Sequence, residues 1–166
     1  PEQLAEKIAE RTDGVPLFVE ELTRSVVESG KPSSLNAEIP DSLQGSLMTR
    51  LDHLAPTAKE IAQIAAVIGR EFDRGLLSKI AGVDDRALET ALNQLESSQI
   101  VVEGGVLHDA LVFRHALIQD AAYQSLLNRR RRHFHERIAR VLVEHYDDVA
   151  ATQPELIAQH YEKAQR

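Results

Sequence analysis

Apolar side chains recur every three or four residues along most of this 166-residue chain. This spacing places them on one face of a helix, so the pattern predicts a mainly α-helical protein. Glycine and proline divide the pattern, since Gly14 fits the end of one helix and Pro16 fits the first turn of the next. The predicted helices cover residues 2–12, 16–29, 43–54, 56–68, 73–81, 84–97, 117–127 and 130–147, and a last helix begins at Pro154.

Between positions 100 and 113 the hydrophobic pattern loses its helical period. The segment Ile100-Val101-Val102-Glu103 is short and β-branched, Gly104-Gly105 is a turn signal, and Leu111-Val112-Phe113 is a second short strand. A β-hairpin that follows three helices is the plan of a winged helix. We therefore expect a winged-helix domain over residues 40–114.

The segments on either side complete the expected domain organisation. Residues 1–30 are expected to form a helical segment, residues 31–39 are a linker by composition, and residues 115–166 are helices that lead toward a helical repeat array. The expected fold class is mainly α, with a short β-hairpin in the winged helix. Since the chain starts with Pro1 and stops inside a helical pattern, we interpret it as a piece of a longer protein.

The amino-acid composition and net charge exclude several classes of protein and several kinds of site. Hydrophobic residues make up 43% of the chain and aromatic residues 4%, so the core must consist of Leu, Ile, Val and Ala, which suits packed helices. The formal net charge of −7 does not favour non-specific binding to nucleic acid or to anionic membranes. The absence of Cys excludes disulfides and thiolate metal sites, and no apolar run reaches membrane-spanning length. We expect a cytoplasmic protein without a membrane partner.

Four segments, in this order along the chain, resemble a known family. They are residues 8–22 with the Gly14-Val15-Pro16 turn, residues 39–43, residues 65–72, and the run Phe113-Arg114-His115-Ala116-Leu117. Together they are similar to the bacterial STAND-type ATPases, the signal-transduction branch of the AAA+ superfamily. Members of that family are often joined to adenylate or guanylate cyclase domains, LuxR-type output domains or protein kinase domains, and are followed by tetratricopeptide repeats.

The resemblance implies roles for three residues. Residues 1–30 would belong to the helical lid of the ATPase module, where Gly14 positions Pro16 against the adenine. His115 would reach the β-phosphate of ADP in the closed state. Arg114 and Ala116 depart from the Met-His-Asp motif of the related plant and animal immune ATPases. An imidazole N–H can donate a hydrogen bond to a phosphate oxygen, so ADP would hold the lid and the winged helix together.

The other half of a nucleotide site is missing from this sequence. No G-x-x-x-x-G-K-[ST] loop occurs, so nothing here would cradle the phosphates or hold Mg²⁺. We therefore expect no catalytic residue and no cofactor bound by this chain alone, with ATP or ADP and Mg²⁺ bound by the full-length protein. The expected partners are the upstream nucleotide-binding domain, the downstream helical repeats and a further protein. No metal site is expected, because His133 and His135 point apart on a helix.

Two alternative functions stay open. The chain also fits a stand-alone protein–protein interaction module. DNA binding is less favoured, because the third helix of the winged helix, residues 84–97, carries four acids and one Arg, whereas DNA contacts need Lys and Arg. The basic run Arg129–Arg132 could contact phosphate, RNA or an acidic partner, or could be a solvated helix start.

Overall fold

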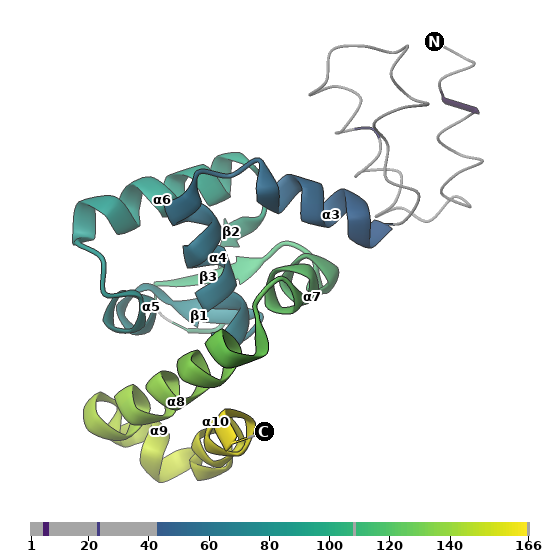
Figure 1. Ribbon diagram of the computed structural model, residues 1–166. Coiled ribbons are helices and arrows are strands. Elements are labelled where there is room, and N and C mark those ends of the chain that lie inside the picture. Colours follow the sequence, from purple (N-terminus) through teal and green to yellow (C-terminus); the bar gives the residue numbers. More distant parts are fainter. Residues whose placement is uncertain (1–4, 7–22, 24–42, 108, 166) are drawn as a thin grey trace. The chain divides into compact units, whose positions relative to one another are not determined.

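The computed structural model describes residues 5–6, 23, 43–107 and 109–165 (Figure 1). The expected lid residues Gly14 and Pro16, and nearly all of the linker and helices before residue 43, lie outside this part of the chain. The chain divides into two compact units, residues 1–50 and 51–166. Helix α3 (Leu43–Asp52) ends in the second unit, which contains every other element described below. The predicted fold class, mainly α with a short β-hairpin, is confirmed.

Residues 56–113 have the element order of a winged helix. The elements are α4 (Pro56–Ile68), β1 (Glu71–Asp73), α5 (Arg74–Ala81), α6 (Asp85–Ser97), β2 (Val101–Glu103) and β3 (Ala110–Phe113). The predicted hairpin is confirmed, since β2 pairs antiparallel with β3 and Val102 lies opposite Val112. Strand β1 pairs with the other edge of β3, which gives the sheet order β1-β3-β2. Strand β1 was not predicted from the sequence, because three residues are too few to show an alternating pattern.

Local side-chain chemistry fixes where these helices begin and end. Pro56 occupies the first turn of α4. Asp73 caps α5, its carboxylate accepting a hydrogen bond from the Leu76 N–H at 2.8 Å, and Asp84 caps α6 in the same way. Gly82 ends α5 in the left-handed conformation, with a φ of 67°. The boundaries predicted from Pro, Asp and Gly in this region therefore hold to within a residue or two.

Four helices follow the sheet: α7 (Ala116–Gln124), α8 (Asn128–His145), α9 (Asp147–Thr152) and α10 (Pro154–Gln165). The short α9 was not predicted as a separate helix. Helix α10 packs along α8, and α4 packs against α5, α6, α7 and α8 (Figure 1). Seven successive residues of α4, Ile61–Val67, are buried, because this helix has neighbours on all sides. Within the described residues, no helix combines the length and the apolar character needed to cross a membrane.

Polar contacts join the C-terminal helices to the winged helix. The Gln63 amide donates to the Ser125 hydroxyl at 2.9 Å, and the Arg137 guanidinium donates to the Lys79 carbonyl at 3.3 Å. The Tyr146 hydroxyl donates to the Asp73 carboxylate at 3.5 Å. Burial, with help from the charge of Asp73, raises the pKa of Tyr146 to about 12. The winged helix and the C-terminal helices therefore form one compact unit.

Arg74 is the centre of an acidic cluster on the winged helix. Its guanidinium lies 3.1–3.4 Å from four carboxylates, those of Glu89, Glu96, Glu103 and Asp109. These acids come from α6, from β2 and from the turn between β2 and β3, so one cation holds three segments together. Four acids around one Arg leave this face of the winged helix with negative charge, as the sequence of α6 predicts.

Candidate functional site

His115 lies where the sequence predicts it, at the junction of a strand and a helix. It is the residue that precedes α7, with extended backbone angles of φ −135° and ψ 141°. Its carbonyl accepts hydrogen bonds from the N–H groups of Ile118 and Gln119, at 3.0 and 3.4 Å. Phe113, two residues before His115, is fully buried at the end of β3, so the backbone on both sides of His115 is fixed. The phosphate-sensing role of His115 stays a prediction, as do the roles of Gly14 and Pro16.

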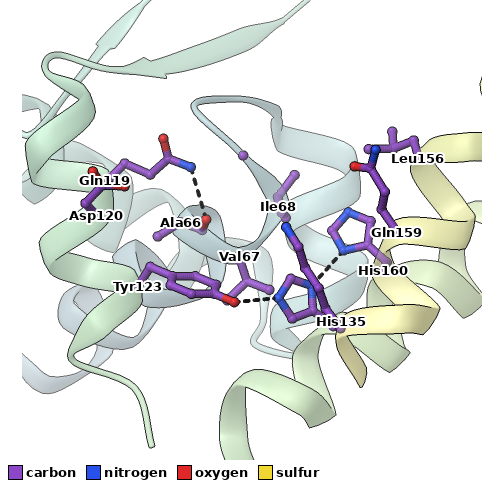
Figure 2. A pocket seen from close by; sticks show the side chains of 12 residues that line it. Ala66, Val67, Ile68, Gln119, Asp120, Tyr123, His135, Leu156, Gln159 and His160 are labelled. Carbon is purple, nitrogen blue, oxygen red and sulfur yellow. Dashed lines mark hydrogen bonds between the residues drawn. The ribbon is translucent and has the colours of Figure 1, made fainter. Parts of the chain in front are cut away.

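A polar cleft opens between α7, α8, α10 and the end of α4, and we call it the histidine cleft (Figure 2). Its volume is about 260 Å³. Gly69 and the last residues of α4 form one wall, and α7, α8 and α10 supply polar side chains. These are Gln119, Asp120 and Tyr123 from α7, His135 from α8, and Gln159, His160 and Lys163 from α10. Residues from four elements meet here although they are far apart in the sequence.

Three side chains in the cleft form a continuous hydrogen-bonded chain. The Tyr123 hydroxyl lies 3.0 Å from Nε2 of His135, and Nδ1 of His135 lies 2.8 Å from Nδ1 of His160 (Figure 2). His135 is 1% exposed and His160 is 6% exposed. The guanidinium of Arg131 covers the Tyr123 ring, 5.1 Å from its centroid. The two imidazoles are thus held in fixed orientations between α8 and α10.

Both imidazoles are neutral at pH 7. Burial lowers the pKa of His135 to about 4, with further contributions from His160, Lys163 and Arg131. Burial and the charge of Lys163 likewise lower the pKa of His160 to about 4. A neutral imidazole has one N–H donor and one acceptor nitrogen. The short contact between the two Nδ1 atoms therefore joins a donor to an acceptor.

Two arrangements of protons satisfy this hydrogen-bonded chain, because the donor and acceptor roles depend on the tautomers of the two histidines. In one arrangement the Tyr123 O–H donates to Nε2 of His135, Nδ1 of His135 donates to Nδ1 of His160, and His160 carries its proton on Nε2. In the other arrangement both bonds run in the opposite direction. In either case Nε2 of His160 lies on the side of the ring away from His135 (Figure 2).

Neither His135 nor His160 was predicted from the sequence to be a site residue. Each lies on the apolar face of its helix, with His135 three residues before Ile138 and His160 three residues after Ile157, and both isoleucines are buried. A polar residue at such a position needs a partner, because burying it unpaired is unfavourable. This signal was present in the sequence, but the partner could not be identified, since 25 positions separate the two histidines.

The other histidines and the basic run are arranged differently. His133 is exposed whereas His135 is buried, so the two point apart as predicted from their spacing. In the part of the chain that the structure describes, no three His, Cys, Asp or Glu side chains lie close enough together to hold a metal ion. Of the run Arg129–Arg132, Arg130 pairs with Glu60, and Arg131 donates to the Leu126 carbonyl at 3.1 Å. These two arginines are thus engaged within the chain.

The chain is similar to an uncharacterized protein of Rhizobium meliloti (strain 1021). The two are 30% identical over 166 residues, an alignment that covers 91% of this chain. The chain spans 15% of the length of that relative. No protein-family model matches the chain. No solved structure matches it.

Proposed function

We propose that this chain is a non-catalytic regulatory region of a larger ATP-dependent signalling protein of the STAND type. In this proposal it couples the nucleotide state, ADP or ATP, to a rearrangement of domains. Gly14 and Pro16 contact the adenine, His115 contacts the β-phosphate, and the phosphate loop with its Mg²⁺ belongs to an upstream domain. The parent protein would be an ATPase, in some cases fused to a nucleotide cyclase.

The position of His115 is the observation that carries the proposal. His115 follows β3, the middle strand of the sheet, and precedes α7, which packs against α4. A phosphate that binds His115 would therefore act on the compact unit as a whole, including α8 and α10. A ligand shifts a conformational equilibrium only through different affinities for the two states. A histidine that meets ADP only in the closed state provides such a difference.

Two further observations support a regulatory segment within a longer protein. The winged-helix order of elements continues directly into the C-terminal helices, and polar contacts such as that of Tyr146 with Asp73 hold the two parts together. The relative from Rhizobium meliloti is also much longer than this chain, which spans 15% of it. A connector that transmits a change from one domain to the next has to be rigid, and it has to lie between other domains.

The test uses the full-length parent protein and the rate of ADP release. We expect His115→Ala to release a fluorescent ADP analogue roughly 10- to 100-fold faster, since a charge-assisted hydrogen bond contributes about 1.5–3 kcal/mol. The output activity should shift toward the active state. The matched control is His133→Ala, which removes an exposed histidine of α8 and should leave the rate unchanged. An unchanged rate of ADP release in the His115 variant would exclude the sensor role.

A protein–protein interaction module is the second candidate, and the turn between β2 and β3 favours it. Val106 in this turn is 96% exposed and Leu107 is 53% exposed, although apolar side chains gain free energy by burial. The sequence upstream of Pro1 separates the two candidates. A phosphate loop there supports the ATPase proposal, whereas its absence leaves the interaction module as the better explanation.

A further inference from the structure

Of the four ring nitrogens of His135 and His160, only Nε2 of His160 lies outside the hydrogen-bonded chain with Tyr123. His160 is 6% exposed, and its Nε2 has no hydrogen-bond partner among the described residues. Nε2 faces the histidine cleft (Figure 2). Nε2 is thus accessible to a ligand in the cleft, and it is a hydrogen-bond donor in the arrangement in which the Tyr123 O–H donates to His135.

The same side of the cleft carries a positive charge. Lys163 follows His160 by three residues on α10, so both side chains lie on one face of the helix, and both line the cleft. The charge of Lys163 helps to lower the pKa of both imidazoles and so to keep them neutral. An ammonium beside a neutral N–H donor favours an anionic acceptor, and a carboxylate accepts from both at once.

The opposite side of the cleft is negative. Figure 2 shows Asp120 and Gln119 of α7 across the cleft from Gln159 and His160 of α10. Helix α4 ends at Ile68, so the negative end of its dipole also lies at the cleft. The Gln119 amide satisfies only one carbonyl of that helix end, that of Ala66, at 3.3 Å. A carboxylate and a helix C-terminus favour a cationic donor such as an ammonium group.

We propose that the histidine cleft is a binding site for a free amino acid. The carboxylate of the ligand accepts hydrogen bonds from Nε2 of His160 and from Lys163, and its ammonium group donates toward Asp120 and the end of α4. The volume of about 260 Å³ lies below the range of about 300–1,000 Å³ found for pockets that hold drug-sized ligands, so the cleft selects a small molecule.

This proposal does not rest on the proposed nucleotide-dependent function. The residues of the cleft do not include His115, and the binding test needs no nucleotide. A failure of the ADP-release experiment would leave the amino-acid site standing, and the reverse is also true. If both proposals hold, an amino acid bound in the cleft acts on the C-terminal helices independently of ATP.

The experiment measures binding to the 166-residue chain. The common L-amino acids are added one at a time, at up to about 10 mM, which detects dissociation constants of about 1 mM. The readouts are the ring signals of His135 and His160 in NMR spectra and the thermal midpoint of unfolding. The same measurements are made with the matched amines, which lack the carboxylate, and with the matched carboxylic acids, which lack the ammonium group. We expect at least one amino acid to bind, and both matched series to bind at least about 10-fold more weakly.

Two exposed residues allow the site to be altered without touching the core. Lys163→Met and Asp120→Asn should each weaken binding of that amino acid about 10-fold or more, with no change in the thermal midpoint of the free protein. Lys79→Met and Asp148→Asn alter exposed side chains outside the cleft and should bind as the wild type does. The proposal is wrong if no amino acid changes either readout, if the carboxylic acids bind as well as the amino acids, or if both cleft variants bind normally.

Discussion

The Nδ1 atoms of His135 and His160 lie 2.8 Å apart, on helices α8 and α10. The rest of the interface between these helices includes buried apolar residues such as Ile138 and Ile157. A polar pair inside such an interface fixes how the helices are aligned, because any shift along the axis would leave a buried nitrogen unpaired. The pair also orients Nε2 of His160, which faces the histidine cleft.

Acid should destabilise the protein between about pH 6.5 and pH 4. The pKa of both histidines is lowered to about 4 by burial, whereas in the unfolded chain it is about 6.5. In this range the unfolded state binds more protons than the folded state, so the free energy of unfolding falls as the pH falls. The loss is complete near pH 4.

The variant His160→Asn tests this prediction. An asparagine amide can still bond to Nδ1 of His135, but it does not titrate. Urea denaturation of the variant should therefore show a smaller decrease in the free energy of unfolding between pH 6.5 and pH 4 than the wild type does. His133→Asn removes an exposed histidine and should keep the full decrease. Equal pH dependence of the His160 variant and the wild type would contradict the buried-pair explanation.

Replacing Tyr123 with Phe should change the tautomer of His160. We expect the Tyr123 hydroxyl to donate to Nε2 of His135 and thereby to set the direction of the whole hydrogen-bonded chain. Without that donor, both tautomers of the imidazole pair become accessible. We expect a loss of about 1 kcal/mol in the free energy of unfolding.

Nitrogen-15 NMR spectra of the imidazole rings give the direct readout. In the wild type, the chemical shift of His160 Nε2 should be that of a protonated nitrogen, and in Tyr123→Phe it should move toward a mixture. Tyr161→Phe, which alters an exposed tyrosine of α10, is the control. A wild-type spectrum with an unprotonated Nε2 on His160 would reverse the assigned direction.

Gly105→Ala should destabilise the turn between β2 and β3 more than Gly104→Ala does. Both glycines have positive φ, 111° and 139°, so both variants strain the backbone. Only at position 105 would the new Cβ also meet a side chain, the Glu71 carboxylate, which accepts a hydrogen bond from the Leu107 N–H at 2.6 Å. Displacing that carboxylate should cost about 1 kcal/mol.

Thermal or urea unfolding measures both variants in two backgrounds. In the wild-type background, Gly105→Ala should be about 1 kcal/mol less stable than Gly104→Ala. In a Glu71→Ala background the two glycine variants should be equally stable, because the carboxylate is no longer there to be displaced. A difference that persists without Glu71 would mean that backbone strain alone explains it.

Duplex DNA should not bind to this winged helix. The exposed side of α6 carries Asp85 and Glu89, and the nearby Arg74 is already surrounded by four carboxylates. The affinity of proteins for DNA comes largely from Lys and Arg that neutralise phosphates, and this face has an excess of negative charge. An electrophoretic mobility-shift experiment at micromolar protein should show free DNA only. A shift that weakens with added salt would contradict the prediction.

Much of the fold follows from local sequence signals. Periodic apolar positions predicted the helices from 43 onward except the short α9. Pro56, Asp73 and Gly82 marked helix limits, and the Gly104-Gly105 pair marked the hairpin. These signals act over a few residues, because they depend on backbone angles and on hydrogen bonds to neighbouring N–H groups. These signals do not predict strand β1, because it forms only through pairing with β3, about 40 positions away. Local signals also do not predict the four acids around Arg74, because these acids come from other segments of the chain.

His115 and the histidine cleft differ in the same way, since one is visible in the local sequence and the other depends on tertiary structure. The sequence by itself placed His115 at a strand-to-helix junction, because a change of hydrophobic period is visible locally. It also showed the acidic character of α6. Only the tertiary structure brought Tyr123, His135 and His160 into one hydrogen-bonded chain and set Asp120 across a cleft from α10. Such a cleft exists because four helices pack side by side, and the order of residues along the chain carries no direct record of which helix faces meet.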